Sequence, residues 1–185
     1  MLLTLRIQLA YIKKPPVWRK ITVPAQFTFY RLHLIIQAAF GWDNYHLYQF
    51  SDKDYGSDVV ISEPTGDDWH EVRNSRKVKV GSVLNTAGQK YQYIYDFGDD
   101  WLHYITVEKA EDIEATKAHC IGGKGTCPPE DCGGPWGYEN LREILANPKH
   151  PEHDEMKEWL GLDGNEKWDS NYFDLEEANA MIAAL

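Results

Sequence analysis

Apolar and more polar side chains alternate along residues 3–11, and this pattern limits the possible folds more than any other feature of the sequence. A period of two places every second side chain on the same face of a strand, so we expect one buried face and one wetter face. The apolar positions are Leu3, Leu5, Ile7, Leu9 and Tyr11. The residues KKPP at 13–16 interrupt the pattern and residues 17–24 resume it, which predicts an antiparallel hairpin.

A helix is predicted directly after this hairpin, over residues 28–40. Thr28 can cap its first turn, and Phe27 and Leu32 occupy the positions at which apolar residues pack around such a cap. Gly41 is a natural stop. The apolar stripe consists of Phe29, Leu32, Ile36 and Phe40. This spacing is typical of a helix that packs one face on a sheet, and we expect it to cover the hairpin.

The middle of the chain predicts a second hairpin. The segments KYQYIYDF (90–97) and WLHYITVEKA (101–110) both alternate, and Gly98-Asp99-Asp100 between them has the composition of a tight turn. HLYQFS (46–51) reads as a further strand. Residues 52–79 are predicted to form acidic loops around a short strand at 59–61.

The last part of the chain is predicted to be helical. The apolar stripe of a first helix begins at Tyr138. A second helix is expected to begin at Pro151 and to end at Gly161, and Asp174 can cap a third helix. Strands come first and helices last, so we predict an α+β fold in a single domain of residues 1–185. Its parts are a mixed strand and helix region (1–110), a loop rich in Cys, Gly and Pro (111–137) and a helical region (138–185).

Charge and composition exclude several classes of protein. The formal net charge is -10, which repels nucleic-acid phosphates, so we expect direct binding to DNA to be weak at most. No apolar run approaches the ~20 residues of a membrane span, and the start of the sequence does not resemble a secretory leader. Three cysteines are an odd number, which favours a reducing compartment over a disulfide framework. We therefore expect a cytoplasmic protein without membrane contact.

Five stretches carry a family resemblance. They are PPVWRKITVP, IIQAAFGWDNYHLYQF, YIYDFGDDWLHYITVEK, CPPEDCGGPWGYENL and NPKHPEHDEMKEWLG. Together they resemble the plasmid pRiA4b ORF-3-like proteins. The resemblance implies an α+β fold with a hairpin followed by a helix, and an association with plasmids or mobile elements, but no defined activity. The chain departs from the family pattern at His46-Leu47-Tyr48, where that pattern usually has two histidines. A role that needs both imidazoles is therefore in doubt.

The segment YDFGDDWLH is one candidate chemical site. Carboxylates and an imidazole can hold a divalent cation or transfer protons. The candidate catalytic residues of a metal-dependent hydrolase are Asp96, Asp99, Asp100, His103 and His46. The alternative is structural, because Asp and Gly also build hairpin turns and a histidine can fill a half-buried face. Asp96-Phe97-Gly98 does not indicate a kinase, since no glycine-rich loop or HRD stretch accompanies it.

The cysteines form a second candidate site. Cys120, Cys127 and Cys132 follow the spacing C-x6-C-x4-C, which is looser than that of structural zinc sites. His103 would be the fourth ligand if the loop held zinc. A disulfide or redox pair is a further alternative. We prefer a rigid loop with buried thiols, in which Gly and Pro set the turns, and we therefore expect no cofactor.

Aromatic residues near turns and strand ends suggest a binding surface, because such residues often anchor a partner. The candidates are Trp18, Trp42, Tyr48, Trp101, Trp136 and Tyr138. The alternative is that they pack the sheet against the helices. The sequence thus favours a binding or accessory module for a protein or small-molecule partner. A metal-dependent hydrolase is the alternative, and a nucleic-acid-associated protein is disfavoured by charge.

Overall fold

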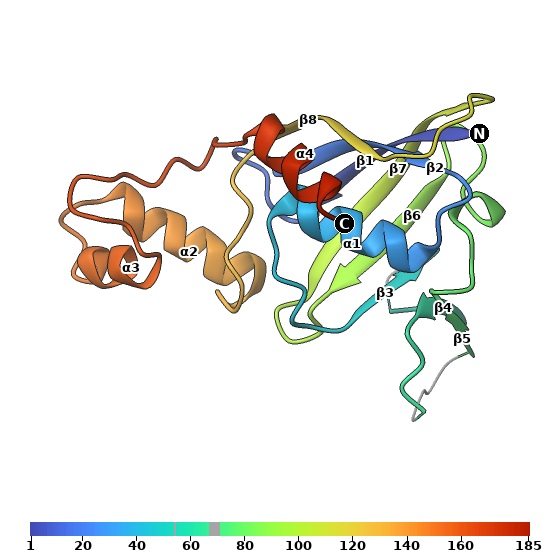
Figure 1. Cartoon of the computed structure of the whole chain (residues 1–185). Coiled ribbons are helices and arrows are strands. Elements are labelled where there is room, and N and C mark those ends of the chain that lie inside the picture. The colour runs from blue at the N-terminus through green and yellow to red at the C-terminus, as the bar shows by residue number, and fades with distance from the viewer. Residues whose placement is uncertain (54, 67–70) are drawn as a thin grey trace.

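The computed structural model of the chain describes residues 1–53, 55–66 and 71–185 (Figure 1). These residues form one mixed sheet with helices, an α+β fold as predicted. The strands are β1 (Leu2–Leu9), β2 (Trp18–Pro24), β3 (Tyr48–Ser51), β4 (Val59–Ser62), β5 (Glu71–Asn74), β6 (Lys90–Tyr95), β7 (Trp101–Glu111) and β8 (His119–Lys124). The helices are α1 (Phe29–Phe40), α2 (Gly134–Ala146), α3 (His153–Trp159) and α4 (Leu175–Ala183), with a short 3-10 helix η1 at Val80–Ser82. The strand order is β5-β4-β3-β6-β7-β1-β2-β8.

The predicted N-terminal hairpin is confirmed. β1 pairs antiparallel with β2 on one side and with β7 on the other, so it lies inside the sheet. Leu3, Leu5 and Ile7 are fully buried, as the alternation requires. The strand ends at Leu9, and Tyr11 is exposed with a φ of 66°, so the predicted strand is two residues too long at this end.

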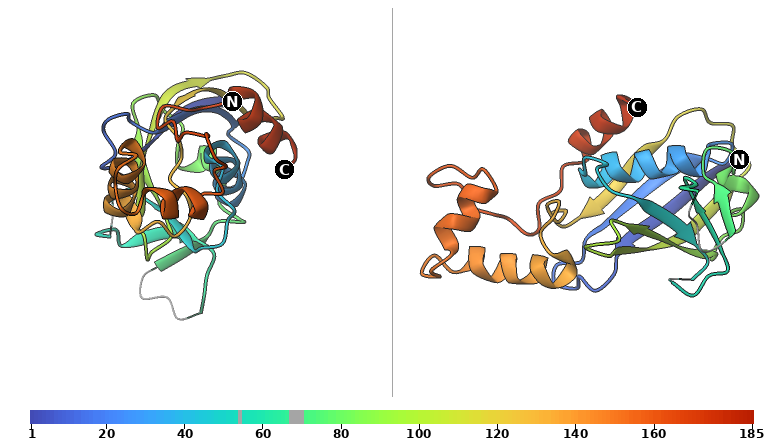
Figure 2. Two further views of the ribbon diagram at one scale, coloured as in Figure 1. Left: turned by 90° about the vertical axis from the view of Figure 1, so that its left-hand side faces the viewer. Right: turned by 90° about the horizontal axis from the view of Figure 1, so that it is seen from below.

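Helix α1 forms where it was predicted. The side chain of its N-cap, Thr28, accepts a hydrogen bond from the backbone N–H of Arg31, at 3.2 Å. Gly41 ends the helix with a φ of 94°, and its N–H donates to the carbonyl oxygen of Gln37. The helix buries Phe29 and Leu32 in the main core against one face of the sheet. Figures 1 and 2 show α4 beside α1 on that face.

The second hairpin is also confirmed, and its turn has an unusual backbone. β6 and β7 pair antiparallel with Tyr95 opposite Trp101. Asp96 and Asp100 have φ values of 56° and 57°, in the left-handed region that aspartate tolerates better than most residues. β3 pairs with the outer side of β6 and carries β4 beyond it.

Strand β5 was not predicted, because residues 52–79 were expected to form loops around one short strand. The strand at 59–61 is confirmed as β4, and β5 pairs parallel to it. β5 is a four-residue edge strand with exposed and half-buried side chains, so it leaves almost no hydrophobic signal in the sequence. Positions 54 and 67–70 of the predicted loop region lie outside the described residues.

The segment 111–137 is not a loop throughout, which corrects the prediction. Its residues His119–Lys124 form β8, which pairs antiparallel with β2 and places Cys120 opposite Ile21. Two glycines lower the strand propensity of this segment, and pairing at the sheet edge overrides that preference. Helix α2 begins at Gly134, four residues before the predicted start, with Pro135 in its first turn.

The C-terminal helices lie in two places. α2 and α3 pack on each other and project away from the sheet (Figure 1). α4 returns to the sheet and packs against α1 and β8 through buried Ala178 and Ile182. The Asp174 side chain caps α4 by accepting from the N–H groups of Glu176 and Glu177, as predicted. Within the residues described, none of the helices combines the length and the apolar character that a membrane crossing requires.

Candidate metal centre

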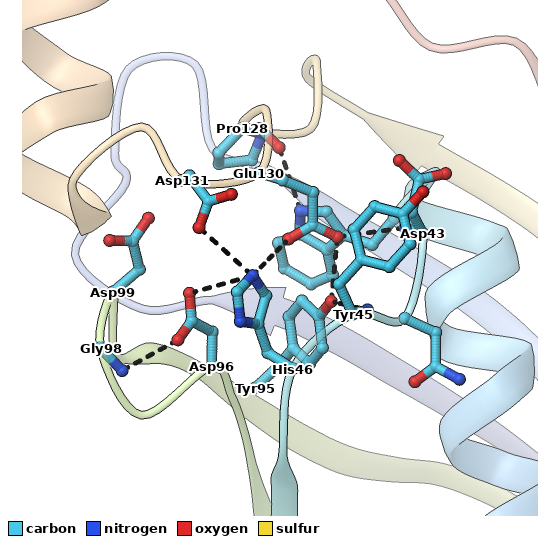
Figure 3. Close-up of polar contacts among 12 residues, drawn as sticks. Asp43, Tyr45, His46, Tyr95, Asp96, Gly98, Asp99, Pro128, Glu130 and Asp131 are labelled. Carbon is cyan, nitrogen blue, oxygen red and sulfur yellow. Dashed lines mark hydrogen bonds and ion pairs between the residues drawn. The ribbon is translucent and has the colours of Figure 1, made fainter.

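Four acidic and basic side chains from three separate segments meet at one end of the sheet (Figure 3). His46 precedes β3, Asp96 follows β6, and Glu130 and Asp131 lie in the loop before α2. The three segments are adjacent because β3 pairs with β6 and because the loop packs over the β6–β7 turn. The pairing of strands therefore creates a cluster whose members are distant in the chain.

The imidazole of His46 is the centre of the cluster. Its Nε2 atom lies 3.3 Å from Oδ1 of Asp131, 3.7 Å from Oδ2 of Asp96 and 3.7 Å from Oε2 of Glu130. The Nε2 atom is buried, yet no hydrogen-bond partner is found for it among the described residues. A buried polar atom without a partner is costly, so a group that binds this atom would stabilise the site.

Local structure aims the Asp96 carboxylate at His46. The left-handed backbone of Asp96 brings its Oδ1 within 2.9 Å of the N–H of Gly98, which donates to it. The N–H of Asp96 donates to the carbonyl oxygen of Leu47, which ties the turn to the segment that carries His46. The second oxygen of Asp96 is thereby turned toward the imidazole, and the residue is only 7% exposed.

Glu130 is held just as firmly. Its Oε1 accepts from the hydroxyl of Tyr95 at 2.9 Å and from the N–H of Asp43 at 3.1 Å. Its Oε2 is buried without a hydrogen-bond partner among the described residues. Burial raises the pKa of the Glu130 carboxyl above its usual value. One oxygen of Glu130 is thus structural, and the other faces the cluster.

The spacing of the cluster fits a metal ion. Ligand atoms bound at about 2.1 Å in a tetrahedral arrangement lie about 3.4 Å apart, close to the distances around Nε2. His46, Asp96 and Asp131 each offer one ligand atom, and these atoms all lie within 4.8 Å of one another. The Asp131 side chain is 72% exposed, so the site opens to solvent on that side. The arrangement therefore offers three donor atoms close together, with Asp131 on the solvent side.

Only part of the predicted catalytic set comes together here. His46 and Asp96 do so, whereas Asp99 accepts from the N–H of Gly133 and Asp100 accepts from the hydroxyl of Tyr55. These two aspartates hold the turn to its neighbours. Glu130 and Asp131 were not predicted, although they lie inside the CPPEDCGG block that carries the family resemblance.

His103 is a core residue rather than a ligand. It is fully buried, and its ring meets those of Phe40 and Trp42 edge to face. Its Nδ1 lies 3.2 Å from the carbonyl oxygen of Tyr93. Burial lowers the pKa of His103 to about 3, so the imidazole is neutral at ordinary pH. The prediction that His103 joins the aspartates or the cysteines is not met, because β7 directs this side chain into the core.

The cysteines do not gather into a metal-binding group within the described part of the chain. All three are free thiols. Cys120 lies buried on β8, and Cys127 and Cys132 pack against the main core. Burial raises the pKa of each thiol, that of Cys132 to about 12, so all three stay protonated at neutral pH.

The predicted partner-binding aromatics divide by burial. Four of the six are core residues and cannot reach a partner in this fold: Trp42, Tyr48, Trp101 and Tyr138. They pack the sheet against the helices and the loop, which was the alternative to a partner-binding role. Trp18 is half-buried beneath the guanidinium of Arg6. Trp136 is 88% exposed and is the most accessible of the six.

Comparison with known proteins places the chain in a family. The sequence profile of the plasmid pRiA4b ORF-3-like proteins matches residues 1–177. The uncharacterized protein y4hQ of Sinorhizobium fredii (strain NBRC 101917 / NGR234) is 37% identical over 181 residues, which cover 97% of this chain and 91% of that protein. The crystal structure of a protein of unknown function, MM3350, from Methanosarcina mazei Go1 matches with a TM-score of 0.77 and 33% identity, and covers 95% of this chain and 96% of that one. The chain therefore belongs to the plasmid pRiA4b ORF-3-like protein family.

Proposed function

We propose that this protein binds one divalent transition-metal ion, of the zinc class, through His46, Asp96 and Asp131. The observation that carries the proposal is the buried Nε2 atom of His46, which has carboxylate oxygens around it at ligand spacing but no hydrogen-bond partner among the residues that the structure describes. An imidazole nitrogen together with carboxylate oxygens is a donor set that zinc accepts. The sequence alone led us to expect no cofactor, and the tertiary arrangement of these residues is the reason for the change.

Charge supports the same assignment. Three carboxylates surround one imidazole, so the partly buried cluster carries excess negative charge even when His46 is protonated. Like charges at such distances repel one another, and either a proton or a cation relieves the repulsion. A divalent ion relieves the repulsion and also supplies a partner for the Nε2 atom of His46, for which none is found among the described residues.

The function that follows is a ligand-binding module that recognises its partner through a metal ion with an open coordination position. The opening lies on the solvent side, next to Asp131. We include the family's association with plasmids or mobile elements in this proposal as context for an accessory role. We also include a cytoplasmic location, since all three cysteines are free, as in a reducing compartment.

A metal-dependent hydrolase is the second candidate, and one observation favours it. Three protein ligands with room for water is the arrangement of catalytic rather than structural zinc sites. The Oε2 atom of Glu130, without a hydrogen-bond partner in the described part of the chain, lies 3.7 Å from the Nε2 atom of His46, where it would be placed to accept a proton from a water on such an ion. Ester and phosphoester hydrolysis by the zinc-loaded protein, absent from a Glu130→Gln variant, would support this candidate.

The metal proposal is tested by elemental analysis of protein purified without a histidine tag. After exposure to zinc and desalting, the unaltered chain is expected to retain about one equivalent. Asp131→Asn should lose most of it, because the amide is a weaker ligand and carries no charge. Asn tolerates the left-handed backbone of this position (φ 55°) as well as Asp does, so the variant should fold.

Two controls separate this site from other sources of metal. Asp112→Asn, at an exposed loop position, should retain about one equivalent. Cys127→Ser should retain it as well, because the thiol lies outside the proposed site. Less than about a tenth of an equivalent in the folded, unaltered chain would refute the proposal. Loss of metal in Cys127→Ser but not in Asp131→Asn would assign the metal to the cysteines instead.

A further inference from the structure

A second site, made of different residues from the metal centre, is indicated by Arg19. This residue lies on β2 and is only 3% exposed. The ion pairs found among the described residues do not include it, so its charge is buried without a carboxylate partner. A buried unpaired charge is rare and costly, and proteins that keep one usually use it.

Backbone carbonyls satisfy one side of the guanidinium. Nε donates to the carbonyl oxygen of Ala39 at 2.8 Å. Nη1 donates to the carbonyl oxygens of Trp18, Lys124 and Gly125 at 2.9 to 3.1 Å. These bonds fix the plane of the group and its orientation. They also tie together β2, the end of α1 and the segment after β8.

Two aromatic rings hold the guanidinium in place. The Arg19 Cζ atom lies 4.9 Å from the ring centroid of Phe40 and 4.3 Å from that of Phe173. Phe173 lies so close to β8 that a Cβ atom added to Gly123 would be 2.6 Å from the ring. The glycine is therefore needed for the Phe173 ring to reach Arg19. The segment before α4 is built around this charge.

One nitrogen of the guanidinium remains free. Within the described part of the chain, Nη2 donates to no protein acceptor. This nitrogen is not fully buried, so a ligand can reach it. Arg19 also lines a cavity of about 270 Å³ between the end of α1, the loop after β8 and the start of α4. Phe40, Cys127 and Met181 line the same cavity. Nη2 is the guanidinium nitrogen without a protein acceptor among the described residues, so its two N–H bonds are the ones that a ligand in this cavity could accept from.

The walls restrict what the cavity can hold. Alanine, aromatic and sulfur-containing side chains surround Arg19, so most of the contact is apolar. Asp174 and Glu177 stand at the same cavity and repel anions of high charge, such as phosphate. The cysteine thiol is protonated, because burial raises its pKa. A ligand with a single negative charge and an apolar body satisfies the free guanidinium nitrogen with the least repulsion.

We propose that this cavity binds a small monocarboxylate, whose carboxylate accepts hydrogen bonds from Nη2 of Arg19 and whose apolar body packs against Phe40 and Phe173. The volume suits a molecule of about ten non-hydrogen atoms or fewer, at the low end of the range of small-molecule sites. The site does not depend on the metal centre, so the two proposals stand or fall separately.

The test uses 4-methylpentanoate as the probe and its amide, 4-methylpentanamide, as the matched uncharged ligand. Binding to the full chain is followed by NMR titration in the presence of EDTA, so that a metal ion contributes nothing. We expect saturable binding of the carboxylate and at least about tenfold weaker binding of the amide, which lacks the charge-assisted hydrogen bonds. Equal binding of the two, or no binding of the carboxylate, would overturn the proposal. So would inorganic phosphate binding as tightly as the carboxylate.

A pair of alanine variants locates the binding site without touching Arg19, whose loss could unfold the chain. Ala38→Leu adds three carbons at the cavity wall on α1 and is expected to weaken carboxylate binding at least about tenfold by filling the space. Ala180→Leu makes the same change on the exposed face of α4, outside the cavity, and should leave binding unchanged. Undiminished binding to folded Ala38→Leu protein would place the ligand elsewhere and refute the assignment.

Discussion

Two tryptophans show how strongly burial decides the role of a single residue. Trp101 is fully buried and its ring centroid lies 6.1 Å from that of Trp42, whereas Trp136 is 88% exposed. We expect Trp101→Ala to lower the free energy of unfolding by about 3–5 kcal/mol, because it leaves a cavity in the core. Trp136→Ala should change it by less than about 0.5 kcal/mol. Urea unfolding followed by circular dichroism measures both, and a similar loss at the two positions would contradict this placement.

His103 should make the stability of the protein depend on pH. Its pKa is lowered from 6.5 to about 3 by burial, so the unfolded chain takes up the proton first as the pH falls. The stability that comes from burying the neutral ring is fully present above about pH 6.5 and is lost progressively as the pH falls toward 3. Within that window the loss is about 1.4 kcal/mol per pH unit for this residue.

The comparison with His103→Gln measures this contribution. The variant has no titrating group at this position, so its stability should fall less steeply between pH 6 and pH 4 by about 1.4 kcal/mol per unit. His33, whose pKa is lowered to about 4, remains in both proteins and cancels. His119→Gln, at an exposed position of β8, is the control and should keep the steeper slope. Identical slopes in the unaltered chain and His103→Gln would show that the imidazole is not held neutral.

At the scale of an element, the start of α2 depends on glycine. A Cβ atom at Gly137 would overlap the carbonyl oxygen of Cys132 in the loop that leads into the helix. Although Ala favours helices by about 1 kcal/mol over Gly, we expect Gly137→Ala to destabilise the protein by about 1–3 kcal/mol. The reason is that the loop must move, and this loop also carries Asp131, one of the proposed metal ligands.

The matched control is Gly56→Ala. Among the described residues, no atom lies within 4 Å of the position that its Cβ would take, so the stability of this variant should stay within about 0.5 kcal/mol of that of the unaltered chain. Thermal unfolding of the two variants and of the unaltered chain measures the difference in stability. If Gly137→Ala were as stable as Gly56→Ala, the loop would not be fixed by this close contact.

At the scale of the whole molecule, charge governs the expected partners. The chain has 29 acidic and 19 basic residues, and the proposed metal site gathers three of the carboxylates at one end of the sheet. We expect binding to duplex DNA no tighter than about 10⁻⁶ M at physiological salt, because tight binding needs several contacts between basic side chains and phosphates. A gel-shift titration at two salt concentrations measures this. Submicromolar binding that weakens steeply with salt would contradict the expectation.

The sequence by itself determined the elements whose signals are local. The alternation in residues 3–11, the Thr28 cap, Gly41 and the capping Asp174 specify β1, α1 and α4, because the periods of strands and helices and their caps involve neighbouring residues only. The order of strands and helices was enough for the α+β class. The quoted motifs were enough for the family, which the match over residues 1–177 confirms.

Only the tertiary structure decided which residues form the candidate metal site. β5 and β8 exist because sheet edges offer hydrogen-bond partners to segments with weak strand preference. His46 and Asp96 meet because β3 pairs with β6, and Asp131 joins them because its loop packs on the neighbouring turn. His103 is a histidine like His46, but its side chain is buried in the core and does not join this cluster. Periodicity in one segment cannot specify which distant segment packs against it, because that choice depends on the free energy of the whole fold.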